Sequence, residues 1–307
     1  MNKNLIFRFP DLNDIQPTLE LMTRCDIHEF GEPDSEREDL VNDWNNINLR
    51  EDAWLTLTPE HNVIGYAAVI PWGAGYKYDL YADPTVENRE IIHALLSRCE
   101  ERSARLVKEQ QKTTGARARC YVTQENQQTS SVLEEIGFQK IKYVYNMQAR
   151  FDAPPPPTKL PNGISICNPI PGRDDHEIYE VIQSAFERPG RTRQPFEDWK
   201  NFMLREDIFK PELWFLAMRG KEMVGACLCY EYSESDQGWV RQLGVLESVR
   251  RTGLGSALLH HAFSEYYKRG FMKVGLAVES KNQRAIHFYK NVGMKQTRCY
   301  VEYSIEI

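Results

Sequence analysis

Two glycines that stand one residue apart, Gly253 and Gly255, mark the stretch of this chain best suited to bind a phosphate group. They end residues 240–255, where an apolar strand pattern passes through a short polar turn and an apolar helical pattern begins. The first amides of a helix have no partner inside it and lie at the positive end of its dipole, so glycines there let a diphosphate approach the backbone. Arg250 and Arg251 add positive charge. An ordinary strand-to-helix turn also favours glycine, so the two glycines alone leave both interpretations open.

A second group of polar residues follows the next predicted strand, at residues 274–278. Asn282, Ala285 and Tyr289 have helical spacing and fall on one face of the helix that we expect there. Tyr289 is thereby placed near the strand ends that carry the glycine turn, where a phenol can protonate a leaving group. The structural alternatives are that Asn282 is only the N-cap of its helix and that Tyr289 is an interfacial core residue.

The elements that position these residues belong to a chain with a proline-rich break near its middle. Residues 152–163 include four consecutive prolines at 154–157, followed by Pro161, Asn162 and Gly163. A proline run cannot donate to a strand ladder and favours an extended spacer. We therefore predict a first module over residues 1–151, a proline-rich linker over 152–163 and a second module over 164–307.

The two halves repeat one pattern of elements. Two predicted strands of the first half have counterparts at an offset of 160 residues: 54–57 with 214–217, and 63–67 with 223–227. Eleven residues separate Asn126 from Gly137 in the first half and Asn282 from Gly293 in the second. We therefore predict a tandem duplication of one α/β module, in the order strand, helix, several strands, helix, strand, helix and two final strands.

The halves differ where a diphosphate would bind. The residues of the first half that align with the glycine turn and the tyrosine are Glu87, Glu90, Ile92 and Leu133. Two carboxylates would repel a diphosphate, and a branched side chain would cover the amides that it needs. We therefore expect a degenerate, non-catalytic first module and place the chemistry in the second.

Composition and charge narrow the class of protein. The chain has 307 residues, of which 41% are hydrophobic and 27% charged, as is typical of a globular protein with two domains. The net charge of -6 argues against a nucleic-acid partner. No apolar run reaches the length of a membrane span, so we expect no membrane partner and a cytoplasmic location. Seven cysteines without metal-ligand spacing predict no metal site, and Cys227 and Cys229 are expected to be buried thiols in a strand.

On these motifs the second half resembles the GNAT superfamily of acyl-CoA-dependent N-acyltransferases. Residues 250–255 match its pyrophosphate motif, and Asn282, Ala285, Tyr289 and Gly293 match its second motif, with Met in place of the commoner Phe after the glycine. The likeness is specific over 214–307, whereas over 5–150 it covers the layout and the final Asn and Gly-Phe signal. It implies two tandem modules, each a mixed, mostly antiparallel central sheet flanked by helices, and acetyl-CoA as co-substrate.

The resemblance also implies a role for each matched residue. In this family the fourth and fifth strands splay apart, and the pantetheine arm lies between them against backbone groups, here those of Leu243 and Val245. The amides of 251–256 would hold the diphosphate, and Tyr289 would protonate the departing thiolate. The implied cofactor-binding residues are Leu243, Val245, Arg250, Arg251, Thr252, Gly253, Leu254, Gly255, Ser256, Asn282 and Ala285.

One position departs from the family pattern. Mycothiol synthases are similar in having two fused modules with a degenerate first one, and they carry a Glu on the fourth strand where this chain has Trp239. An indole cannot accept a proton. Glu279 is our candidate general base, Glu231 and Glu234 could act through water, and a substrate amine of low pKa needs no base.

The resemblance implies an N-acetyltransferase that moves an acetyl group from acetyl-CoA to a primary amine by direct attack. We expect a small-molecule acceptor rather than a protein, and a monomer. The basic loop at 188–193 lies where this family lines its acceptor site, which suggests an acidic group on the acceptor; a solvated loop is the alternative. The competing function is a non-catalytic acyl-CoA-binding regulatory or interaction protein.

Overall fold

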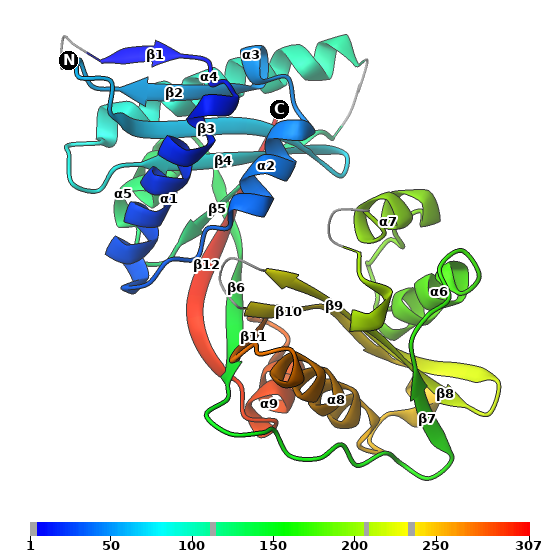
Figure 1. Ribbon diagram of the computed structural model, residues 1–307. Helices are drawn as coiled ribbons and strands as arrows, with labels where there is room; N and C mark the ends of the chain where they lie inside the picture. Colours follow the sequence, from blue (N-terminus) through cyan, green and yellow to red (C-terminus); the bar gives the residue numbers. More distant parts are fainter. Residues whose placement is uncertain (1–4, 111–114, 206–208, 233–236) are drawn as a thin grey trace. The chain divides into compact units, whose positions relative to one another are not determined.

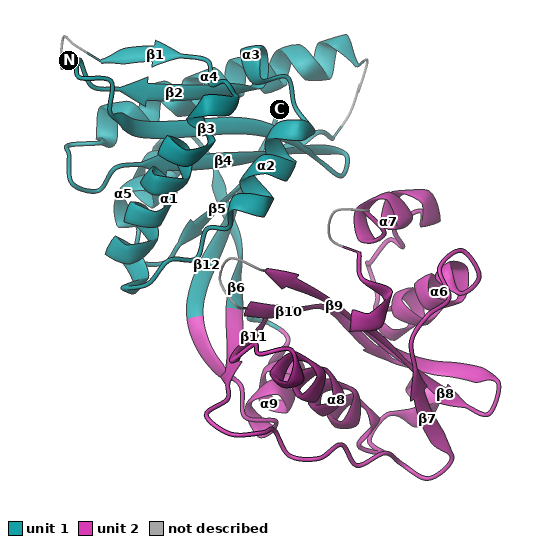
Figure 2. Ribbon diagram, in the orientation of Figure 1, with its two compact units in different colours: residues 1–145, 279–281, 298–307 teal, residues 146–278, 282–297 magenta. Residues whose placement is uncertain are grey.

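The computed structural model describes residues 5–110, 115–205, 209–232 and 237–307 (Figure 1). The chain forms two compact units, which Figure 2 colours separately. Unit 1 comprises residues 1–145, 279–281 and 298–307, and unit 2 comprises residues 146–278 and 282–297. Within the described part of the chain, no helix has both the length and the apolar character needed to cross a membrane.

The first half of the sequence begins with a short strand and a helical layer. In chain order its elements are β1 (Ile6–Arg8), α1 (Ile15–Phe30), α2 (Arg37–Asn45), α3 (Leu49–Asp52), β2 (Ala53–Leu57), β3 (Val63–Trp72), β4 (Gly75–Ala82), α4 (Arg89–Glu109), β5 (Arg117–Thr123), α5 (Gln127–Glu135) and β6 (Gln139–Arg150).

The second half follows the same plan. Its elements are β7 (Ile164–Cys167), α6 (Asp175–Ala185), α7 (Phe196–Met203), β8 (Trp214–Arg219), β9 (Glu222–Tyr232), β10 (Gln237–Val245), α8 (Leu254–Lys268), β11 (Lys273–Glu279), α9 (Gln283–Asn291) and β12 (Lys295–Glu306). The predicted duplication is confirmed, with one difference: each half ends in a single long strand, β6 or β12, rather than in two. Each of these segments runs for 12 residues without a turn.

The described strands form a mixed, mostly antiparallel sheet in the order β1-β2-β3-β4-β5-β12-β6-β11-β10-β9-β8-β7. Parallel pairing joins β4 to β5 and β10 to β11. The predicted fold class, two tandem modules of sheet and flanking helices, is therefore confirmed.

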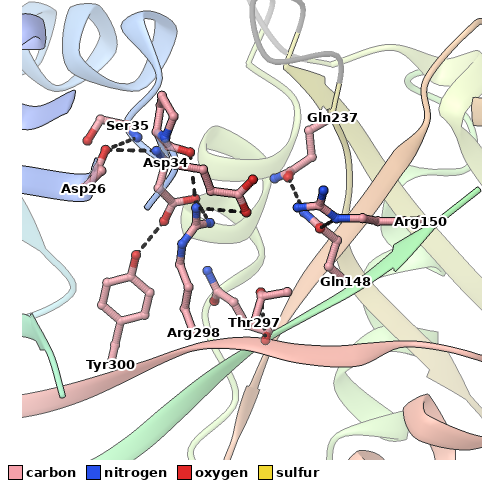
Figure 3. Close-up of polar contacts among 12 residues, drawn as sticks. Asp26, Asp34, Ser35, Gln148, Arg150, Gln237, Thr297, Arg298 and Tyr300 are labelled. Atoms are coloured by element: carbon pink, nitrogen blue, oxygen red, sulfur yellow. Dashed lines mark hydrogen bonds and ion pairs between the residues drawn. The ribbon is translucent and has the colours of Figure 1, made fainter. Parts of the chain in front are cut away.

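The last strand of the chain contributes to unit 1. β12 pairs antiparallel with β5, from Tyr300 opposite Thr123 to Glu306 opposite Arg117. Within the same unit, Tyr300 Oη donates to Asp34 Oδ2 at 2.5 Å, and the buried Arg298 forms an ion pair with Asp34 (Figure 3). The repeats of the sequence and the compact units therefore have different boundaries. Residues 151–163, which include the predicted linker, contain no helix or strand.

Alternating residues of the central strands supply the core on two faces. In β9, Ala226, Leu228 and Tyr230 pack with α6 and α7. The residues between them, Cys227 and Cys229, are fully buried on the opposite face, as the period of two along a strand requires. Both cysteines are free thiols, as predicted.

Candidate active site

The strands β10 and β11 of unit 2 separate shortly after they begin. Their parallel register covers only three pairs, from Gln237 opposite Lys273 to Trp239 opposite Gly275. Beyond this point β10 continues to pair with β9 as far as Val245, opposite Gly225. In the described part of unit 2, the edge of β10 that faces β11 is therefore open over residues 240–245.

A β-bulge lies at the start of this open edge. The register of β10 against β9 shifts between Val240 and Gln242, so Arg241 has no residue opposite it. A Cβ atom on Gly238 would lie 2.6 Å from the Tyr266 ring of α8, which shows that Gly238 faces α8.

The bulge also aligns β10 with the helices on its other face. A Cβ atom on Gly244 would lie 2.8 Å from Ala185 Cβ, so Gly244 faces α6. Arg241 and Gln242 of β10, which the sequence analysis did not single out, contact α7 at the bulge. Trp199 Nε1 donates to Gln242 Oε1 at 3.1 Å, and the Arg241 guanidinium lies 4.5 Å from the centre of the Phe202 ring. No local sequence motif predicts these contacts, because each joins segments about forty residues apart.

The glycine turn leads from the end of β10 into α8. Gly253 precedes the helix with a φ of 89°, and Arg251 has a φ of 66°, a left-handed conformation that is uncommon outside glycine. The first helical bond of α8 runs from Ala257 N–H to Gly253 C=O at 3.0 Å. The amides of residues 254–256 therefore precede the hydrogen-bond ladder of the helix and point out of its N-terminus.

Gly255 lies where three elements of unit 2 meet. A Cβ atom built there would be 3.4 Å from Phe288 Cζ in α9 and 3.7 Å from Val245 Cγ2 at the end of β10. Leu254 is 1% exposed and anchors the first turn of α8 in the core. The predicted residues Val245, Gly255 and Ser256 are thus brought together with the helix that carries Tyr289.

The two other side chains of the turn stabilise the loop itself. Arg250 Nη2 donates to the carbonyl of Ala185, the last residue of α6, at 2.9 Å, and its Nε lies 3.4 Å from Val245 O. Thr252 Oγ1 donates to Val249 O at 2.8 Å. The Arg250 guanidinium therefore joins the end of α6 to the end of β10, a contact that its position in the motif did not predict.

Asn282 and Tyr289 lie at the two ends of α9. The Asn282 side chain accepts from Ala285 N–H at 3.1 Å, so the predicted N-cap is confirmed. Tyr289 C=O accepts from Met294 N–H at 3.0 Å, and Gly293 between them has a φ of 91°. This pattern ends the helix in the way that a glycine after the last turn favours.

The Tyr289 phenol lies in a partly buried setting beside Phe288, with ring centres 5.2 Å apart. Burial, with a smaller contribution from the neighbouring Cys227, raises the pKa of Tyr289 to about 12. Cys227 stands opposite Leu243 in the β9–β10 pair. The phenol therefore stays protonated at neutral pH near the open edge of β10.

The carboxylates considered as bases are held by cations. Glu279, at the end of β11, belongs to unit 1, where its Oε1 lies 2.8 Å from Lys142 Nζ. Glu231 stands opposite Gly238, hence on the α8 face, and forms ion pairs with Lys210 and with Arg269. Glu234 lies outside the described residues.

Two arginines of the basic loop at 188–193 contact the neighbouring residues of their own segment. Arg193 forms ion pairs with Glu180 at 3.0 Å and with Glu187 at 3.1 Å. Arg191 donates to Phe186 O at 2.8 Å and lies over the Phe186 ring. In this arrangement the two guanidinium groups serve to shape the loop.

Together, an open strand edge, a set of outward amides and a protonated phenol lie within one part of unit 2. Such a site can hold an extended chain against the strand, an anion at the helix N-terminus and a developing anion near the phenol. Among the described residues, no group of three or more His, Cys, Asp or Glu side chains is arranged to hold a metal ion.

Comparison with known proteins shows what this part of the chain is similar to. Residues 176–294 match the acetyltransferase (GNAT) family. Mycothiol acetyltransferase of Catenulispora acidiphila is 31% identical over 160 residues, which cover 50% of this chain and 50% of that protein. Mycothiol acetyltransferase of Acidothermus cellulolyticus is 27% identical over 238 residues, 72% of each chain. The match spans about half the length of the first of these curated relatives.

Solved structures match the whole architecture. A GCN5-related N-acetyltransferase from Sphaerobacter thermophilus has a TM-score of 0.83 at 27% identity and covers 98% of this chain and 95% of its own. A tandem GNAT protein from the clavulanic acid biosynthesis pathway has a TM-score of 0.73 at 16% identity, with 98% of both chains covered, and shows the shared fold alone.

Proposed function

Because the chain has the tandem GNAT architecture and its residues 176–294 belong to the GNAT acetyltransferase family, we propose that it transfers an acetyl group from acetyl-CoA to a primary amine. We place the reaction in the second module. The observation that supports this most is the open edge of β10, which lies beside the N-terminus of α8 and the helix of Tyr289.

The residues of this site fit the parts of acetyl-CoA. The unpaired backbone edge of residues 240–245 suits the extended pantetheine arm, with Leu243 and Val245 as its contacts. The amides of 254–256, with the turn at 251–253, suit the diphosphate. Bound there, acetyl-CoA would supply the acetyl group and a thiolate leaving group.

Tyr289 is the proposed general acid. Its hydroxyl is protonated at neutral pH, as any phenol is, and burial raises its pKa further. It would donate a proton to the sulfur as the carbon–sulfur bond breaks. Asn282 and Ala285 would act mainly through α9, because the Asn282 cap fixes the start of the helix that holds Tyr289.

The acceptor is proposed to be a small-molecule amine. The protein is proposed to act as a monomer. Its nitrogen would attack the acetyl carbon directly while backbone amides near the bulge stabilise the charge on the oxygen. Glu279 is retained as a candidate base through water, although its ion pair with Lys142 favours the anion and so makes it a weaker proton acceptor.

Calorimetry with acetyl-CoA, followed by thiol release over a panel of amines, tests this function. We expect tight binding and one thiol released for each amine acetylated. Binding without thiol release for any amine would instead support a non-catalytic acyl-CoA-binding protein. A lack of binding would contradict both functions.

A further inference from the structure

We infer that Trp239 determines acceptor specificity: its indole forms an aromatic wall at the closed end of the β10–β11 opening, and the site takes a weakly basic amine of the arylamine class. This inference rests on the proposed function. It concerns the residue at which, by the family resemblance, a carboxylate was expected.

The indole and Gly275 form a matched pair. A Cβ atom built on Gly275 would lie 2.6 Å from Trp239 Cζ3 and 2.8 Å from its Cε3, so the ring lies directly on the β11 backbone. Only glycine leaves room for it. Trp239 and Gly275 are also the last register pair before the strands separate, so the ring lies where the opening begins.

The ring faces the side of the sheet covered by α6 and α7. Trp239 stands opposite Tyr230, whose side chain packs in the core beneath α7 and whose hydroxyl donates to Met203 O at 3.2 Å. Its neighbour Gly238 faces α8, as the alternation of a strand requires. Tyr232 extends the aromatic wall, with ring centres 6.4 Å apart.

The polar groups around this wall are amides and cations. Gln237, two residues before Trp239, accepts from Gln148 Nε2 at 2.9 Å, and Gln148 Oε1 accepts from Arg150 Nε at 2.8 Å (Figure 3). On β11, Lys273 shares the face of Gly275 because the two are two positions apart in the strand. Arg241 follows Trp239 at the bulge.

Two carboxylates of the described residues are directed elsewhere, whereas Glu234 and Asp236 lie outside the described residues. Glu231 lies on the α8 face and is paired with Lys210, and Glu279 is paired with Lys142 in unit 1. Within the described part of unit 2, the charged residues of β10 and β11 nearest to the indole are therefore the cations Lys273 and Arg241. This setting disfavours a protonated alkylammonium and leaves a neutral arylamine unaffected.

The chemistry then needs an amine that already has a free lone pair. The amine nitrogen forms a bond to the acetyl carbon, the carbon–sulfur bond breaks, and Tyr289 gives its proton to the sulfur. The nitrogen loses a proton to water as the neutral amide forms, and the Tyr289 phenolate takes a proton back from water. An alkylamine has a pKa of roughly 10 and is mostly protonated at neutral pH, whereas an arylamine is neutral there. The ring of an arylamine can also pack on the indole.

Aniline and cyclohexylamine, which share a six-membered ring, form the test pair. We expect kcat/KM for aniline to exceed that for cyclohexylamine at least about tenfold near pH 7. The value for cyclohexylamine should rise about tenfold per pH unit up to its own pKa, because only its neutral form reacts. A preference for cyclohexylamine near pH 7 would overturn this inference and leave the proposed function intact, whereas thiol release with neither these nor any other amine would overturn both.

Three variants separate specificity from folding. Trp239→Glu supplies a carboxylate and should shift the ratio toward cyclohexylamine about tenfold. Trp239→Phe keeps an aromatic wall and should keep the preference for aniline. Gly275→Ala displaces the indole and should raise KM for aniline with little change in acetyl-CoA affinity. If Trp239→Glu does not fold, the pH profile of the unaltered protein still decides, and an unchanged ratio in a folded Trp239→Glu would contradict the inference.

Discussion

The helices α4 and α8 follow equivalent strands in the two halves, but α4 begins two positions earlier when the halves are aligned. In α4 the amide of Ile92, the residue that aligns with Gly255, already donates to Asn88 O at 2.9 Å. In α8 the first such bond comes from Ala257. Each helix leaves its first three amides outside the hydrogen-bond ladder, but α4 has Glu90 in this first turn, whereas α8 has Gly255 and no acidic residue there. The two helix starts therefore differ in charge and side-chain bulk rather than in their free amides.

The separation of the strands, by contrast, is common to both halves. β4 and β5 pair in parallel over three residues, from Tyr76 opposite Ala118 to Tyr78 opposite Cys120, as β10 and β11 do. The register of β4 against β3 runs without a shift, however, so this half lacks the bulge of β10. The two halves thus share the separated strands and differ in the bulge.

Leu133 and Tyr289 occupy the same place in their helices. Phe138 N–H donates to Leu133 O at 2.9 Å, and Met294 N–H donates to Tyr289 O at 3.0 Å. Leu133 is 0% exposed and belongs to the main core of unit 1, whereas the Tyr289 phenol is partly exposed. The same backbone position therefore carries a core side chain in one half and a partly exposed phenol in the other.

Leu133→Ala should give the largest effect on stability. Removing a fully buried leucine costs about 2 to 5 kcal/mol through lost burial and the cavity that remains. Denaturant unfolding followed by circular dichroism measures this loss. Acetyl-CoA affinity, measured below the unfolding transition, should stay unchanged, and a parallel fall in affinity would mean that the first half takes part in binding.

Gly253→Glu combined with Gly255→Ile gives the second half the residues of the first. The acetyl-CoA affinity should fall by about a hundredfold or more, because Glu is strained at a positive φ and repels the diphosphate, and Ile covers the amides. Calorimetry measures the change. Gly270→Ala is the matched control, since Gly270 is also left-handed, at φ 91°, but lies at the other end of α8; it should cost stability alone. If Gly270→Ala lost as much acetyl-CoA affinity as the double variant, the glycine turn would not be the diphosphate site.

Tyr289→Phe should lower kcat at least about tenfold with little change in acetyl-CoA affinity, because only the proton donor is removed. Tyr266→Phe is the control: its hydroxyl donates to Tyr230 O within the core, so its loss should affect stability rather than the rate. An unchanged kcat in Tyr289→Phe would remove this residue from the mechanism.

Features set by local residue types could be predicted from the sequence. The repeated order of elements and the Asn282 cap depend on residue types along short segments and were found in the structure as predicted. The splayed strands followed from family resemblance rather than from the strand sequences themselves.

Features that depend on distant partners could not be predicted. The bulge at Arg241 has no local signature, the tie from Arg250 to Ala185 joins residues 65 apart, and the partner of Glu279 lies 137 residues away at Lys142. The pairing of β12 with β5 likewise depends on which strand edge is available after folding. Side-chain contacts between the two strands, such as the ion pair of Arg119 with Glu302 at 3.3 Å, join residues that are far apart in the sequence.

The smallest expected effect is on the pH dependence of kcat above about pH 8. An ordinary tyrosine ionises near pH 10, but burial raises the pKa of Tyr289 to about 12, so its acid form persists at every pH below that value. With saturating acetyl-CoA and an amine that is already neutral, kcat should therefore stay level from about pH 8 to about pH 10.5. Stopped thiol-release assays across this range measure the profile. If kcat instead fell with an apparent pKa near 10, and this fall disappeared in Tyr289→Phe, the phenol would be far more exposed to solvent during turnover than it is in this structure. That result would sharpen the contrast with the buried Leu133 of the first half.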